Sequence, residues 1–87
     1  MPPNPLWGEL MNYLIMQDFS GRPAAFIFPR RVDHADMRAQ LPYSSTLSGG
    51  VVEMIDGQLV CSGGNAELDI KAGPRDSEII RESLRHR

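Results

Sequence analysis

Cysteine is almost absent from this chain of 87 residues, in which Cys61 stands alone. A single cysteine cannot form an internal disulfide, and small secreted domains usually depend on such cross-links. No basic residue precedes Arg22, and the apolar stretch from Leu10 to Met16 is too short to span a bilayer, so we expect neither a signal peptide nor a membrane anchor. The expected location is the cytoplasm.

Histidine and lysine are also scarce, which limits the chemistry that the chain can offer. Lys71 is the only lysine, and His34 and His86 are the only histidines. Asp33, His34 and Asp36 lie too close together in the sequence to converge on one ion, so we expect no metal site. No glycine-rich segment ends in the Gly-Lys-Ser/Thr pattern of a nucleotide-binding loop, and no cofactor is expected.

The net charge and the composition exclude further classes of protein. A formal net charge of −2 opposes general attraction to nucleic acid, which depends on clustered lysine and arginine. The hydrophobic fraction of 41% and the charged fraction of 23% are those of an ordinary folded domain rather than a disordered tail. A chain this short offers one core, so we expect residues 1–87 to form a single domain.

The first apolar segment begins at Asn4-Pro5, an N-cap residue followed by proline at the first helical position. The spacing that follows predicts a helix over about Pro5 to Gln17. Its apolar side chains fill an arc of roughly 200°, about twice the stripe that a surface helix buries. Trp7, Met11 and Ile15 extend past the part that could pack on a sheet, which predicts a partner surface. Burial of the whole arc within the chain is the alternative.

Three elements follow in the middle of the chain. The continuous apolar run Ala24–Phe28 predicts a strand buried on both faces. A short helix is predicted from an N-cap at Asp33 to about Gln40. The pair Asp56-Gly57, between apolar alternations, predicts a two-residue β-hairpin with strands over Val51–Ile55 and Gln58–Cys61.

The last part of the chain predicts one more strand and a helix. Ala66–Lys71 alternates apolar and charged residues, as a strand with one dry face does. Asp76 is placed to begin a helix to about His86, with Ile79, Ile80 and Leu84 on its inner face. The predicted order is therefore α-β-α-β-β-β-α. This is an α+β fold in which a small, mostly antiparallel sheet of about four strands carries its helices mainly on one face.

The segments Ser48-Gly49-Gly50 and Ser62-Gly63-Gly64 are expected to meet at the open end of the hairpin. In the hairpin register Gly50 lies opposite Gly63, and Gly49 lies opposite Gly64. Glycines at such a place favour a bend or a bulge in the sheet. A nest of backbone amides that binds an anion is the alternative.

Arg30 and Arg31 lie between a predicted strand and a predicted helix start, where guanidinium and amide groups can converge on a phosphate. A solvated pair, or a pair bridged to Asp33 and Asp36, is the simpler interpretation. Cys61 is interpreted as a small buried apolar residue rather than a reactive thiol, because nothing in the sequence places a base beside it.

These features predict a non-enzymatic protein-interaction module that self-associates through its first helix, since a homodimer is the commonest assembly of this kind. The alternative is a domain that binds nucleic acid or a phosphate-bearing ligand through Arg30, Arg31 and the paired glycines. An enzyme centred on Cys61 or His34 is a third hypothesis, for which the sequence offers no pairing of nucleophile and base.

Overall fold

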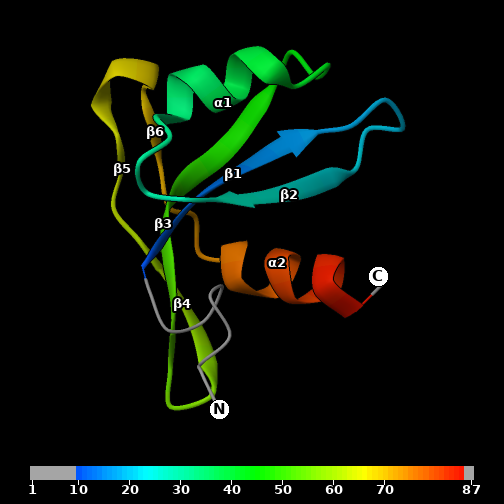
Figure 1. The fold of residues 1–87 in the computed structure, drawn as a ribbon. Coiled ribbons are helices and arrows are strands. Elements are labelled where there is room, and N and C mark those ends of the chain that lie inside the picture. Colours follow the sequence, from blue (N-terminus) through cyan, green and yellow to red (C-terminus); the bar gives the residue numbers. More distant parts are fainter. Residues whose placement is uncertain (1–9, 86–87) are drawn as a thin grey trace.

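The chain folds around an antiparallel sheet of four strands in the computed structural model, which describes residues 10–85 (Figure 1). Its elements are β1 (Met11–Gln17), β2 (Pro23–Phe28), α1 (His34–Gln40), β3 (Thr46–Ile55), β4 (Gln58–Ser62), β5 (Gly64–Asn65), the 3-10 turn η1 (Ala66–Leu68), β6 (Ile70–Lys71) and α2 (Asp76–Arg85). The strand order is β2-β1-β3-β4, and β5 and β6 form a separate pair. The predicted α+β class and small antiparallel sheet are therefore confirmed.

Strand β1 lies inside the sheet, although the sequence pattern predicts a helix there. That prediction is wrong for Met11–Gln17, and the residues before Leu10 lie outside the described part of the chain. β1 pairs with β2 on one side and with β3 on the other, and six of its seven residues are buried. A strand in this position is apolar on both faces. The wide apolar arc that the segment shows when it is drawn as a helix therefore corresponds to the two buried faces of a strand.

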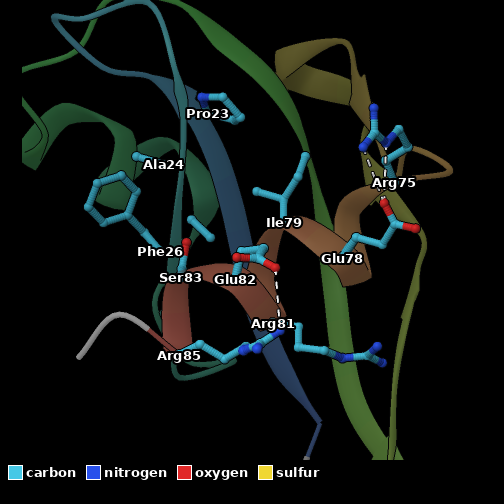
Figure 2. A pocket seen from close by; sticks show the side chains of 11 residues that line it. Pro23, Ala24, Phe26, Arg75, Glu78, Ile79, Arg81, Glu82, Ser83 and Arg85 are labelled. Carbon is cyan, nitrogen blue, oxygen red and sulfur yellow. Dashed lines mark hydrogen bonds and ion pairs between the residues drawn. The ribbon is translucent and has the colours of Figure 1, made fainter.

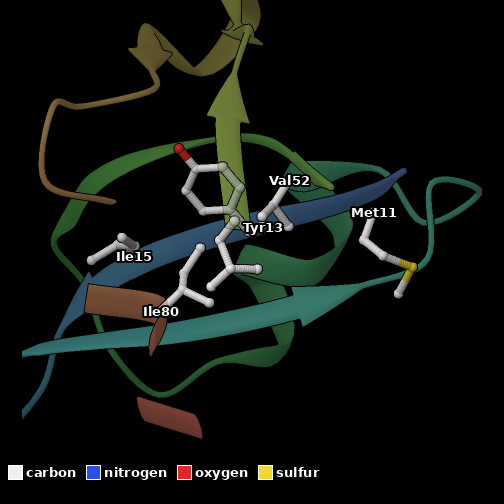
Figure 3. Packing of buried hydrophobic residues seen from close by; sticks show 6 residues of the cluster. Met11, Tyr13, Ile15, Val52 and Ile80 are labelled. Carbon is white, nitrogen blue, oxygen red and sulfur yellow. The ribbon is translucent and has the colours of Figure 1, made fainter. Parts of the chain in front are cut away.

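Alternate residues of β1 fill two hydrophobic clusters on opposite faces of the sheet. One cluster lies beneath α2 and contains its Ile80, while the other lies beneath α1 and packs against its Met37 (Figures 1 and 3). The expectation that the helices pack mainly on one face is therefore wrong. The buried members of the α2 cluster are Met11, Tyr13, Ile15, Val52, Leu59 and Ile80, and those of the α1 cluster are Leu14, Met16 and Phe28.

The hairpin of β3 and β4 forms as the sequence predicts. Ile55 pairs with Gln58, and the two turn residues Asp56 and Gly57 have φ angles of 51° and 79°. Positive φ at both positions defines the type I′ turn that the Asp-Gly pair favours. This local chemistry sets the register of the whole hairpin.

Both helices begin where the sequence indicates. Asp33 is the N-cap of α1, and its carboxylate accepts a hydrogen bond of 3.2 Å from the amide of Ala35. Helix α2 begins at Asp76 and buries Ile80 completely, with Ile79 packed partly against the same cluster. The apolar side of α2 matches the predicted one, because Ile79, Ile80 and Leu84 all pack in the cluster beneath that helix.

Two strand predictions are wrong in part. β2 is an edge strand whose residues are mostly half-buried, rather than a strand buried on both faces. Of the segment Ala66–Lys71, only the last two residues form a strand. The Asn65 side chain accepts hydrogen bonds of 3.0 and 3.3 Å from the amides of Glu67 and Leu68, which begins a 3-10 turn. Such local side-chain bonds compete with the hydrogen-bond ladder of a strand.

The substitution Met11→Glu should unfold the domain, because Met11 is 6% exposed in the cluster beneath α2. A carboxylate buried there without a counter-charge costs several kcal/mol, about as much as a small domain has to lose. Circular dichroism should show lost structure. The matched control is Leu47→Glu at a position that is 52% exposed, where we expect a folded protein. A folded M11E protein would contradict the placement of β1.

The substitution Gly57→Val should lower the free energy of unfolding by about 1 kcal/mol or more, because a β-branched residue resists positive φ. No heavy atom lies within 4 Å of the position that a Cβ at Gly57 would take, so only backbone strain is tested. Gly57→Asn is the control, since asparagine tolerates this conformation and should cost less. Chemical denaturation measures all three proteins, and equal stability of G57V and the native chain would refute the turn type.

Candidate functional site

Two of the three residues predicted to form a partner surface lie inside the domain. Met11 and Ile15 are 6% and 0% exposed and belong to the cluster beneath α2. Trp7 lies outside the described residues. Met11 and Ile15 are therefore core residues of this chain, and an interaction surface has to be looked for on other elements.

A buried carboxylate ties the start of α2 to the sheet. Asp76 is 3% exposed, and its carboxylate accepts hydrogen bonds from the Tyr13 hydroxyl of β1, from the Ser48 hydroxyl of β3 at 2.8 Å and from the Gly73 amide at 2.7 Å. Burial, together with the bond to Asp76, raises the pKa of the Tyr13 hydroxyl far above its ordinary range. The polar groups of this cluster form hydrogen bonds with one another, so the cluster has a structural role.

Cys61 lies on the same face of the sheet, half-buried beside this cluster. Burial raises the pKa of its thiol, and the negative charge of Asp76 raises it further. A reactive cysteine needs the opposite shift, because the thiolate is the nucleophile. His34 packs at 5.5 Å against Phe28, which belongs to the cluster on the other face, so the one histidine in residues 10–85 does not lie beside the thiol.

A groove of about 640 Å³ lies between β2 and α2 (Figure 2). Residues 23–26 of β2 line it, and because Ala25 and Phe26 point to opposite faces of the sheet, the groove passes around the edge of the strand. Ile79 adds an apolar side chain from α2. The rim carries charges of both signs, from Arg75 just before α2 and from Glu78, Arg81, Glu82 and Arg85 of the helix.

The charged rim is only loosely organised. Arg75 bridges Glu78 at 3.3 Å and Arg85 bridges Glu82 at 3.6 Å, and all four side chains are exposed. Exposed ion pairs of this kind contribute little to stability. Arg81 forms no ion pair with any residue that the structure describes. The guanidinium group of Arg81 is therefore available to a partner.

A second pocket, of about 430 Å³, contains both arginines that the sequence singled out. Arg30 and Arg31 line it together with Asn12, His34 and Gly64. Neither arginine forms an ion pair with a described residue, so the predicted bridge to nearby aspartates is not seen. Asp33 and His34 follow the arginines directly in the chain, whereas Asn12 reaches this place only through the pairing of β1 with β2, which the sequence analysis did not predict.

The paired glycines act mainly as a bend. The β3–β4 ladder ends at Val51 and Ser62, one pair short of the predicted Gly50–Gly63 pair. A Cβ at Gly50 would lie 2.3 Å from the Ser62 carbonyl oxygen, so the two segments approach closely at this point. Gly63 has a φ of 71°, and this left-handed backbone turns the chain away from β3. Gly49 and Gly50 are buried and Gly64 alone lines the arginine pocket. The four glycines do not form one nest.

Two further findings concern residues 10–85 only. No three His, Cys, Asp or Glu side chains come close enough together to hold a metal ion. Neither helix in this range has the length and apolar character that crossing a bilayer requires.

Alkaline pH should destabilise the domain through Tyr13. In the unfolded chain a tyrosine ionises near its ordinary pKa of about 10, whereas burial and Asp76 keep Tyr13 protonated in the folded state. The stability that this proton contributes is complete below pH about 10 and is lost as the pH rises further. The free energy of unfolding should fall by about 1.4 kcal/mol per pH unit in that range.

Urea denaturation across this pH range measures the slope, with Tyr13→Phe as the matched control. Cys61 adds a slope of the same sign in both proteins because burial raises its pKa, and Tyr13→Phe also removes a hydrogen bond that lowers the pKa of that thiol. We expect a shallower slope in Y13F. Equal slopes in the two proteins would contradict a phenol that is buried and protonated in the folded state.

Comparison of the chain with family models, curated proteins and solved structures found no match. The β2–α2 groove and the arginine pocket are therefore interpreted from their own geometry.

Proposed function

We propose that the protein is a non-enzymatic interaction module that forms a homodimer through the outer edge of β2. The observation that carries this proposal is the outer edge of β2, which pairs with no other strand in residues 10–85 and lies beside the β2–α2 groove. Exposed strand edges readily pair with a further strand.

The backbone groups of β2 divide into two sets. Hydrogen-bonded pairs alternate along an antiparallel ladder, and the Asp18 amide donates to the Arg22 carbonyl at 2.8 Å in the turn that joins β1 to β2. The next hydrogen-bonded pair is two residues further along each strand, at Met16 and Ala24. The amide and carbonyl of Ala25 and Ile27 therefore point away from β1, toward the open edge.

Two copies of β2 can pair about a two-fold axis that passes beside Phe26. In this antiparallel register Ala25 of one copy lies opposite Ile27 of the other, and each such pair exchanges two hydrogen bonds. The two Phe26 side chains then face each other with Cβ atoms about 4.5–5.5 Å apart. The result is one continuous sheet across the dimer, in which the outward amides and carbonyls of Ala25 and Ile27 are hydrogen-bonded.

The charges on the rim of the groove favour a second copy of this chain over a partner that carries charges of one sign only. The rim carries three arginines and two glutamates, so neither a strongly acidic nor a strongly basic segment matches it well. A surface with both signs can match a rotated copy of itself, which a two-fold dimer brings to it. The formal net charge of −2 likewise does not favour nucleic acid as the partner.

The cytoplasm is the location that we propose for this module. The free Cys61 contributes no cross-link, and a reducing compartment suits a chain with one unpaired cysteine.

The substitution Ala25→Pro tests the proposal directly. Proline removes the outward amide and leaves the β1–β2 hydrogen bonds intact, and edge strands tolerate it at such a position. One hydrogen bond is lost from each copy, so the dimer should weaken by about 10- to 100-fold while the monomer stays folded. Light scattering after size exclusion gives the mass, and circular dichroism confirms the fold.

Ala25→Ser is the matched control, because it changes the side chain and keeps the amide. We expect it to remain dimeric. A native protein that stays monomeric at high micromolar concentration would refute the proposal, and so would an A25P protein that dimerises as well as A25S does. A native monomer that binds an extended peptide along β2 would replace self-association by peptide binding.

A further inference from the structure

The arginine pocket suggests a second binding activity that does not depend on the dimer. Arg30 and Arg31 occupy the two central positions of a turn closed by a hydrogen bond of 3.0 Å from the Val32 amide to the Pro29 carbonyl. The buried Asn12 side chain donates to the Val32 carbonyl at 2.9 Å and to the Arg30 carbonyl at 3.5 Å. The backbone that carries both arginines is therefore held in place before any ligand arrives.

His34 adds a buried polar group to the same pocket. It is 6% exposed, and its Nε2 lies 2.9 Å from the Gly50 carbonyl oxygen. A carbonyl only accepts, so Nε2 carries the proton and Nδ1 has no partner among the described residues. His34 lines the pocket, and the bond to Gly50 holds its ring in place.

We propose that this pocket binds the phosphate group of a small molecule. Two guanidinium groups that form no ion pair within residues 10–85 supply charge and forked donors, which match phosphate oxygens. The start of α1 contributes nothing, because Asp33 already caps it.

Asp33 is the one acidic side chain on the pocket, and it makes the proposal sharply testable. It reduces the positive charge contributed by the two arginines, so its removal should strengthen phosphate binding. Asn is as good an N-cap residue as Asp, so Asp33→Asn removes the charge and keeps the helix start. Asp33→Asn should therefore raise the affinity for phosphate, and loss of the two arginines should lower it.

The experiment is a titration of the full chain with inorganic phosphate, followed by the amide signals in nuclear magnetic resonance, with sodium chloride at equal ionic strength as the reference. We expect saturable shifts for residues 30–34 and for Gly64. The double substitution R30Q/R31Q should weaken binding by at least about 10-fold. D33N should strengthen it, and Arg38→Gln, on the exposed side of α1 and outside the pocket, should leave it unchanged.

Three results would overturn the proposal: shifts that do not saturate, binding that survives in R30Q/R31Q, or shifts that chloride alone reproduces. A short single-stranded oligonucleotide presents the same phosphate oxygens in a polymer. Binding of the oligonucleotide without binding of inorganic phosphate would also overturn a small-molecule site. The A25P monomer should bind phosphate as the native protein does, so failure of the dimer and failure of this site are distinguishable.

Discussion

The structure depends on the burial of β1 on both faces. Alternate side chains of this strand form the base of two cores, Tyr13 and Ile15 toward α2 and Leu14 and Met16 toward α1. A strand buried in this way needs a pairing partner on each side and a helix over each face, and the chain supplies all four. Both candidate binding sites follow from this arrangement, because β2 is left at the edge with α2 beside it and the arginine turn begins just after β2 ends.

The sequence predicted correctly those features that depend on residues close together in the chain. The Asp56-Gly57 turn, the cap at Asp33 and the apolar side of α2 all rest on residues within one turn of each other, and all three are confirmed. The first segment was ambiguous because an apolar run that fills a wide helical arc also fills both faces of a strand. The Asn4-Pro5 pair favoured the prediction of a helix. Met11–Gln17 is instead a strand, because it pairs with a neighbouring strand on each side.

The sites were harder to predict than the elements, because long-range contacts make them. Asp76 reads locally as a helix start, yet its carboxylate binds Tyr13, 63 positions away. His34 meets Gly50 across 16 positions, and Asn12 holds a turn 20 positions further along. Arg30 and Arg31 were identified from the sequence, but the pocket around them exists only once β1 and β3 have paired.

The bond between Tyr13 and Asp76 also bears on how the chain is made. It joins one of the first described strands to the start of the last described helix, and Ile80 of that helix completes the cluster on which Tyr13 lies. During synthesis the face of β1 that α2 covers therefore stays open to water until the segment around residue 80 has left the ribosome. Contacts so distant in sequence slow folding, and the exposed apolar face of the nascent chain is then a target for chaperones.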